Sequence, residues 1–114
     1  MKNLFDLTGK RALITGSAQG IGNLLASGLA AHGAEIVIND ITQQRAQAAA
    51  DKLVAEGYRA VGYGFDVTSG EEVACAIAQI EKDVGAIDIL INNAGIQRRY
   101  PFTEFPEAEW DKVI

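Results

Sequence analysis

The residues best suited to chemistry lie in the run Thr15–Gly22, where Gly16, Gly20 and Gly22 fall within seven residues. The run joins a short apolar segment to a longer one whose apolar residues recur at helical spacing. Glycines let the backbone bend sharply and expose its N–H groups to a ligand. The N-terminus of the following helix adds a partial positive charge, which favours a phosphate. The spacing G-x-x-x-G-x-G, without a following Gly-Lys-Ser/Thr, predicts a dinucleotide turn and not a P-loop.

An acidic residue follows at a distance that suits a dinucleotide site. Asp40 ends the apolar run Ile36–Asn39, about 20 residues beyond the glycine turn. Its carboxylate can accept hydrogen bonds from ribose hydroxyls, although a solvated loop aspartate is the simpler alternative. The same carboxylate would repel a 2′-phosphate, and the first arginine after it is Arg45. The sequence therefore favours NAD over NADP as the cofactor, with NADP as the alternative.

Polar and charged residues also follow the third and fourth apolar runs. Asp66 and Val67 could hold an adenine ring, and an Asx turn explains the aspartate equally well. The small and amide residues of Asn92–Gly95 would let the backbone approach a ligand, or form an ordinary turn. Arg98 and Arg99 could hold an acidic substrate by bidentate hydrogen bonds, with solvated loop arginines as an equal alternative.

The elements that must position these residues alternate along the chain. Continuous apolar strands separated by helices indicate a parallel sheet covered on both faces. Right-handed crossovers and a phosphate turn after the first strand give the strand order 3-2-1-4. We therefore predict an α/β fold, the N-terminal half of a Rossmann-like doubly wound parallel sheet. The expected strands cover 11–15, 35–39, 59–65 and 87–91, and the expected helices cover 20–32, 42–56 and 70–84, with a further helix opening at Pro106.

Composition narrows the classes of partner. The chain has 114 residues, is 48% hydrophobic and carries a formal charge of −5, which argues against nucleic acid or an anionic membrane as a partner. The sequence contains no apolar stretch of membrane-spanning length. One Cys and one His exclude a disulfide framework and predict no metal site. We expect a soluble cytoplasmic protein, with Cys75 as a buried, inert thiol.

The motifs Thr15–Gly22, Asp66–Val67 and Asn92–Gly95, in this order and spacing, resemble the short-chain dehydrogenase/reductase family. One branch of it, the gluconate 5-dehydrogenases or 5-keto-gluconate 5-reductases, is similar to this sequence in the segments Leu4–Gly16, Ile36–Thr42, Asn92–Arg99 and Pro101–Pro106. The resemblance covers essentially the whole chain. It implies an oxidoreductase that transfers hydride between a nicotinamide cofactor and gluconate or 5-keto-gluconate.

The resemblance also implies roles for individual residues. The cofactor-binding residues would be Gly16, Ser17, Ala18, Gln19, Gly20, Ile21, Gly22, Asp40, Asp66, Val67, Asn93, Ala94 and Gly95. Arg99, with Arg98 beside it, matches the position that meets the carboxylate of a sugar-acid substrate. Members of the family associate through later helices, so the resemblance implies a homo-oligomer for the complete protein.

One part of the family pattern does not occur in these residues. The family uses a tyrosine with a lysine four residues later to move the proton, together with a serine and a helix asparagine. Tyr58, Tyr63 and Tyr100 are each followed, four residues on, by another residue type. The resemblance therefore implies that the catalytic serine, tyrosine, lysine and asparagine lie beyond Ile114, and that none of the residues 1–114 is catalytic.

We accordingly expect residues 1–114 to be the N-terminal part of a single NAD(P)-binding Rossmann domain whose catalytic half is absent. One alternative is another member of the family, such as a 2-deoxy-gluconate 3-dehydrogenase or a 3-oxoacyl reductase. The other alternative is a nucleotide-binding fragment without catalysis.

Overall fold

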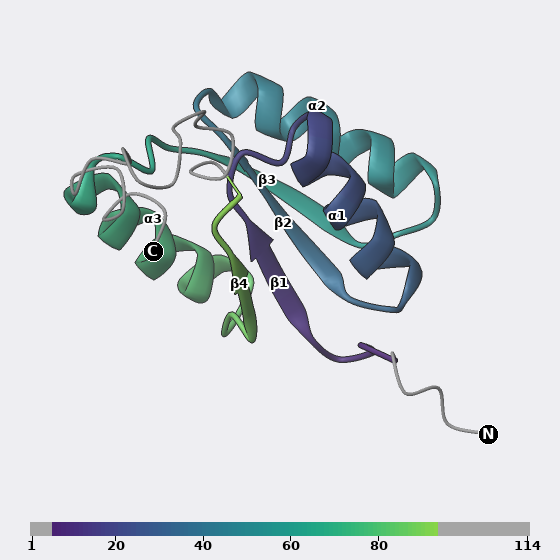
Figure 1. Cartoon of the computed structure of the whole chain (residues 1–114). Helices are drawn as coiled ribbons and strands as arrows, with labels where there is room; N and C mark the ends of the chain where they lie inside the picture. Colours follow the sequence, from purple (N-terminus) through teal and green to yellow (C-terminus); the bar gives the residue numbers. More distant parts are fainter. Residues whose placement is uncertain (1–5, 94–114) are drawn as a thin grey trace, which may run out of the picture.

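The computed structural model describes residues 6–93, which form a four-stranded parallel sheet with helices on both faces (Figure 1). The strand order β3-β2-β1-β4 confirms the predicted topology. None of the helices in this part of the chain combines the length and apolar character needed to cross a membrane. The elements are β1 (Arg11–Ile14), α1 (Gly20–Ala31), β2 (Glu35–Asp40), α2 (Gln43–Ala55), β3 (Ala60–Gly64), α3 (Gly70–Asp83) and β4 (Ile89–Ile91).

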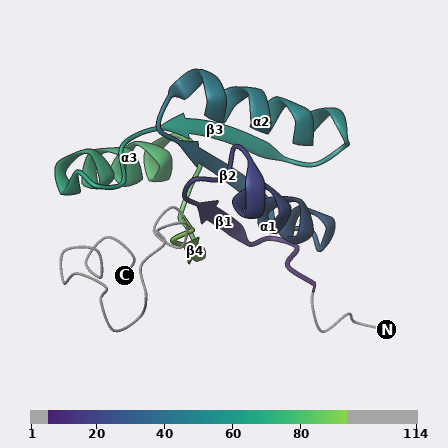
Figure 2. The ribbon, with the colours of Figure 1, turned by 45° about the horizontal axis from the view of Figure 1, so that its top comes forward.

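Alternate side chains of the central strands point to opposite faces of the sheet, and each face has its own hydrophobic core. Ile36 and Ile38 of β2 pack with residues of α1 and α2 on one face of the sheet. Val37, between them, packs with Leu13, Phe65 and Ile80 on the face that α3 covers. Figure 2 shows α3 on the side of the sheet away from α1 and α2. A strand that is apolar on both faces is what a covered parallel sheet requires.

The helix boundaries follow the expected start and stop signals. Thr42 and Ser69 cap α2 and α3, each accepting a hydrogen bond from the backbone N–H three residues later. Gly33, Gly57 and Gly85, which follow the three helices, have φ of 101°, 95° and 137°, a region that favours glycine. The N-cap of α1, in contrast, makes no side-chain hydrogen bond.

The glycines of β3 let α2 approach the sheet closely. A Cβ atom on Gly62 would lie 2.6 Å from the carbonyl carbon and oxygen of Ala46 in α2. The buried residues of α2 are small as well, including Ala46, Ala49 and Ala50. Helix and strand therefore touch through backbone and methyl groups.

The structure differs from expectation at Cys75. Cys75 is exposed, so the prediction of a buried thiol is wrong. The reason is the position of Cys75 around the helix. The face of α3 that packs on the sheet carries Ile77 and Ile80, and Cys75 lies outside that face. In α1 the buried residues are small, whereas Leu24 is 73% exposed.

We expect residues 1–114 alone to unfold without a sharp cooperative transition. Leu90 on the edge strand β4 is 52% exposed and Ile21 of α1 is 59% exposed, so large apolar side chains of both the sheet and a covering helix meet water. Calorimetry of the isolated chain checks this. A single sharp transition together with tight cofactor binding would contradict it.

The Gly62→Ala variant should destabilise the complete protein by roughly 1–3 kcal/mol or more, because the new methyl group overlaps backbone atoms of α2 that cannot rotate away. Gly28→Ala is the control, since a Cβ there meets no described atom within 4 Å. Alanine in a helix interior should leave stability unchanged or raise it by roughly 0.5–1 kcal/mol. Chemical denaturation of both variants measures the difference; equal effects would contradict the packing argument.

Candidate dinucleotide site

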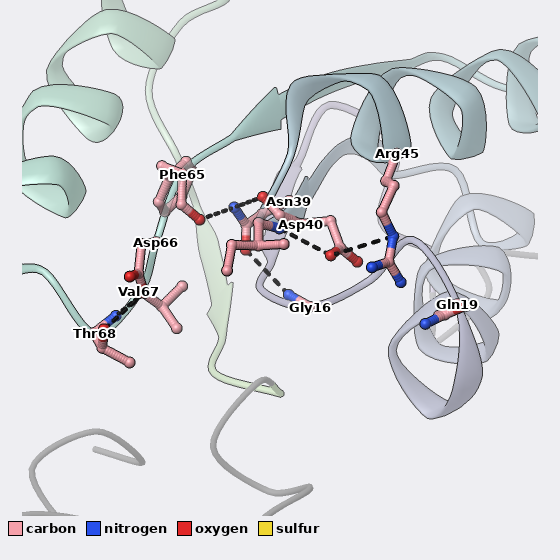
Figure 3. Close-up of a pocket in the computed structure, with 10 residues that line it drawn as sticks. Gly16, Gln19, Asn39, Asp40, Arg45, Phe65, Asp66, Val67 and Thr68 are labelled. Carbon is pink, nitrogen blue, oxygen red and sulfur yellow. Dashed lines mark hydrogen bonds and ion pairs between the residues drawn. The ribbon is translucent and has the colours of Figure 1, made fainter.

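The carboxyl ends of β1, β2 and β3 border a cavity of about 290 Å³ (Figure 3). Strand ends of a parallel sheet meet at one edge, which is where this fold class binds ligands. The cavity brings together five residues predicted from the sequence and five others. Its lining consists of Gly16, Gln19, Asn39, Asp40, Ile41, Arg45, Phe65, Asp66, Val67 and Thr68.

Gly16 is held from both sides by side-chain amides. Its N–H donates to Asn39 Oδ1 at 3.1 Å, and its carbonyl oxygen accepts from Asn93 Nδ2 at 3.1 Å. Gly16 and Gly20 have φ of 60° and 66°, a region that favours glycine. The turn therefore has a fixed shape set by the ends of β2 and β4.

Ser17 contributes to that shape from inside the protein. It is fully buried, and its hydroxyl donates to the Ile14 carbonyl at 2.6 Å and accepts from the Asn39 N–H at 3.1 Å. The Ser17 N–H donates to the Asn39 carbonyl at 2.8 Å. The polar groups of Ser17 are thus used to hold the turn against β2.

Gly22 allows α1 to start close to the turn. A Cβ atom there would lie 2.5 Å from both Asn93 Nδ2 and the Gly16 carbonyl oxygen. The first N–H groups of an α-helix have no partner within the helix, and Gln19 supplies no side-chain cap. The start of α1 can therefore offer N–H groups and its dipole to an anion.

Asp40 ends β2 beside the cavity, as the sequence predicts. Its Oδ1 accepts from the Ile41 N–H at 2.8 Å and lies 3.8 Å from Arg45 Nε in α2. The Asp40 side chain is 12% exposed and that of Arg45 is 47% exposed. The site thus presents a carboxylate and a guanidinium side by side, because the first turn of α2 returns the arginine to the strand end (Figure 3).

Asp66 forms the Asx-type turn that the sequence left open as an alternative. Its Oδ1 accepts from the Thr68 N–H at 2.9 Å and the Thr68 hydroxyl at 2.7 Å. This turn orients the segment after β3, so that Asp66 and Val67 line the cavity. The turn and a role at the cavity are therefore compatible.

The remaining predicted residues have different surroundings. Ala18 is half-buried against the core, Gln19 is exposed, and Ile21 is 59% exposed. Asn93 is fully buried, and its Oδ1 has no hydrogen-bond partner among residues 6–93.

Some of the sequence predictions fall on residues that the structure does not describe. Ala94, Gly95, Arg98 and Arg99 lie outside the described residues, as does the helix expected from Pro106. Ile114 lies outside them too. The expectation that the family's catalytic serine, tyrosine, lysine and asparagine follow Ile114 therefore stays a prediction, and the structure assigns no catalytic role within residues 6–93.

Tyr63 near the end of β3 does not line the cavity, but the pKa of its phenol is raised. Burial raises the pKa of its phenol, and the hydrogen bond that it donates to Asp83 Oδ2 at 3.1 Å raises the pKa further. The phenol therefore stays protonated and links β3 to α3. This agrees with the sequence, which places Val67 and not a lysine four residues later.

Sequence reasoning missed Asn39 as a member of the site. Asn39 is 1% exposed, and its amide bonds to the glycine turn and to carbonyl groups of Tyr63 and Phe65. The available signal was an amide residue within an otherwise apolar run expected to be buried on both faces. A polar group at such a place must find hydrogen-bond partners.

These features together fit a dinucleotide. The N–H groups at the start of α1 suit a pyrophosphate, the carboxylate of Asp40 suits ribose hydroxyls, and the segment Asp66–Val67 suits a base. No group of three or more His, Cys, Asp or Glu side chains within residues 6–93 is arranged to bind a metal ion.

Comparison with known proteins agrees with this geometry. A family model described as short chain dehydrogenase matches residues 10–114. The chain is 61% identical over 114 residues to the 5-keto-D-gluconate 5-reductase of Escherichia coli, covering all of this chain and 45% of that protein. It is 49% identical over 112 residues to the gluconate 5-dehydrogenase of Gluconobacter oxydans, covering 98% of this chain and 44% of that protein.

Solved structures share the fold. A gluconate 5-dehydrogenase from Burkholderia cenocepacia, crystallised in complex with NADP and tartrate, has a TM-score of 0.80 and 50% identity. The alignment covers 96% of this chain and 43% of that one. The chain thus spans less than half the length of the relatives that it matches. Because the family model matches nearly the full length of this chain, and the glycine turn, the acid and the strand order agree with it, the chain belongs to the short-chain dehydrogenase family.

Proposed function

We propose that the complete protein is a nicotinamide-dependent oxidoreductase that interconverts gluconate and 5-keto-gluconate, and that residues 1–114 supply most of its cofactor site. The observation that carries the proposal is the cavity at the carboxyl edge of the sheet, where the glycine turn, Asp40 and Asp66–Val67 come together. The similarity of the whole chain to proteins named for this reaction supports it.

The residues of this chain would divide the cofactor between them. The turn from Gly16 to Ile21 and the start of α1 would bind the pyrophosphate, with Gly22 permitting the close approach. Asp40 would accept hydrogen bonds from the adenosine ribose, and Asp66–Val67 would contact adenine. Asn93 and the following Ala94 and Gly95 would border the ribose on the nicotinamide side. When bound, the nicotinamide ring supplies or accepts hydride at its C4.

The arrangement of Asp40 and Arg45 bears on the choice between NAD and NADP. The sequence preference for NAD rests on a carboxylate without a neighbouring cation. The structure pairs that carboxylate with the half-exposed guanidinium of Arg45 at 3.8 Å. A 2′-phosphate would therefore meet a positive charge, and a similar gluconate 5-dehydrogenase was crystallised with NADP. We propose NADP as the preferred cofactor, with NAD accepted through Asp40.

The proposed substrate class is a sugar acid. Relatives along the whole chain are named for gluconate and 5-keto-gluconate, and one of similar fold was crystallised with tartrate, a hydroxy acid. Arg98 and Arg99 are proposed to meet the substrate carboxylate. The proton would be moved by a tyrosine and lysine in the part of the protein that follows Ile114.

Turnover by the complete protein tests the substrate. Loss of reduced-nicotinamide absorbance should accompany addition of 5-keto-gluconate, and NADPH should support a higher kcat/KM than NADH. The competing substrates are a 3-oxoacyl thioester, a ketone assayed in the same direction, and 2-deoxy-gluconate, an alcohol assayed with the oxidised cofactor. Faster turnover of either one would move the protein to another branch of the family, and no turnover of any would favour a nucleotide-binding role without catalysis.

Two variants test the cofactor preference against each other. Arg45→Gln should raise the KM for NADPH roughly tenfold or more, because a charge-assisted hydrogen bond to the 2′-phosphate is lost, and should change the KM for NADH little. Asp40→Ala should raise the KM for NADH and spare NADPH. Steady-state kinetics with both cofactors decides the matter. Equal effects of Arg45→Gln on the two cofactors would place the 2′-phosphate elsewhere.

A further inference from the structure

The side-chain amide of Asn39 joins several segments at the edge of the cavity. Its Oδ1 accepts from the Gly16 N–H at 3.1 Å. Its Nδ2 lies 3.1–3.2 Å from the carbonyl oxygens of Asp40, Tyr63 and Phe65. Figure 3 shows its amide between the glycine turn and the end of β3.

The two ends of this amide serve different segments. The acceptor end fixes the first glycine of the phosphate turn, which follows β1. The donor end fixes carbonyl groups at the end of β3, immediately before Asp66. Few side chains of this size carry both a donor and an acceptor, and an apolar residue of the same volume would leave the Gly16 N–H without its partner.

From these contacts we propose that Asn39 is a positioning residue for cofactor binding, which locks the phosphate turn and the adenine-side segment into one prearranged edge. The inference rests on the proposed function, because it assumes that the cavity binds a nicotinamide dinucleotide. Asn39 is buried, so it would act on the cofactor through the residues that it holds in place. Its effect would be on the shape of the part of the site that binds adenosine. A site already held in its bound shape loses less conformational entropy when the ligand binds.

If this is so, Asn39 should affect the affinity for the cofactor and not the rate of hydride transfer. The loss of the Asn39 amide should weaken every ligand that carries the ADP-ribose part of the cofactor by the same factor. The rate at saturating cofactor should not change, because the amide contacts the adenosine end of the proposed site and not the nicotinamide end. A residue that merely stabilised the fold would show neither pattern.

The test uses the complete protein with Asn39→Leu, which keeps the number of side-chain heavy atoms and removes the amide, and Asn39→Thr, a smaller neutral change that suits a strand. ADP-ribose is the binding probe, since it lacks nicotinamide. We expect its dissociation constant and that of NADPH to rise roughly tenfold in both variants, because the Gly16 N–H loses its partner and the turn is no longer tied to the end of β3. The kcat at saturating NADPH should stay within about twofold of the parent.

Ile38→Val is the matched control, because it trims the neighbouring buried residue of β2 without touching the polar contacts. It should lower the melting temperature and leave ADP-ribose affinity unchanged. If Asn39→Leu does not fold, Asn39→Thr decides. Unchanged ADP-ribose affinity in a folded Asn39 variant would overturn the inference, whether or not kcat falls. Failure of the parent protein to bind both ADP-ribose and NADPH would instead overturn the proposed function.

Discussion

The hydrogen bonds at Gly16 are the constraint on which the rest of the site depends. Its N–H is held by Asn39 from β2 and its carbonyl by Asn93 from the end of β4. The turn after β1 is thereby tied to both neighbouring strands of the sheet. Because the strands are parallel, these ties lie at the same edge as Asp40 and Asp66. The site is an outcome of strand order as much as of the glycines themselves.

Small residues make this arrangement sterically possible. Gly22 lets α1 begin against the turn and Asn93, and Gly62 lets α2 lie against β3. The close approach of α2 brings Arg45 back beside Asp40. Packing and electrostatics are therefore coupled. A side chain at Gly62 would displace α2, which carries Arg45, and a side chain at Gly22 would displace the start of α1 from the turn.

Sequence patterns predicted the elements well because their signals are local. The N-caps Thr42 and Ser69 and the glycines that end the helices act over one turn, and the observed bounds agree with the expected ones to within two residues. Exposure was predicted less well. The thiol of Cys75 is exposed because burial depends on which face of a helix meets the sheet, and the apolar surroundings of a residue in the sequence do not specify that face.

The sequence by itself determined the chain's class: a glycine turn, an acid at the end of the second strand and alternating elements are local patterns tied to backbone chemistry. Tertiary structure alone decided how the polar groups are shared. It assigned the amide of Asn39 to Gly16 and to β3, the hydroxyl of Ser17 to the interior, and Arg45 to Asp40. These pairings join segments far apart in the chain or separated by a turn. A hydrogen bond depends on distance and direction in space, and spacing along the sequence sets neither.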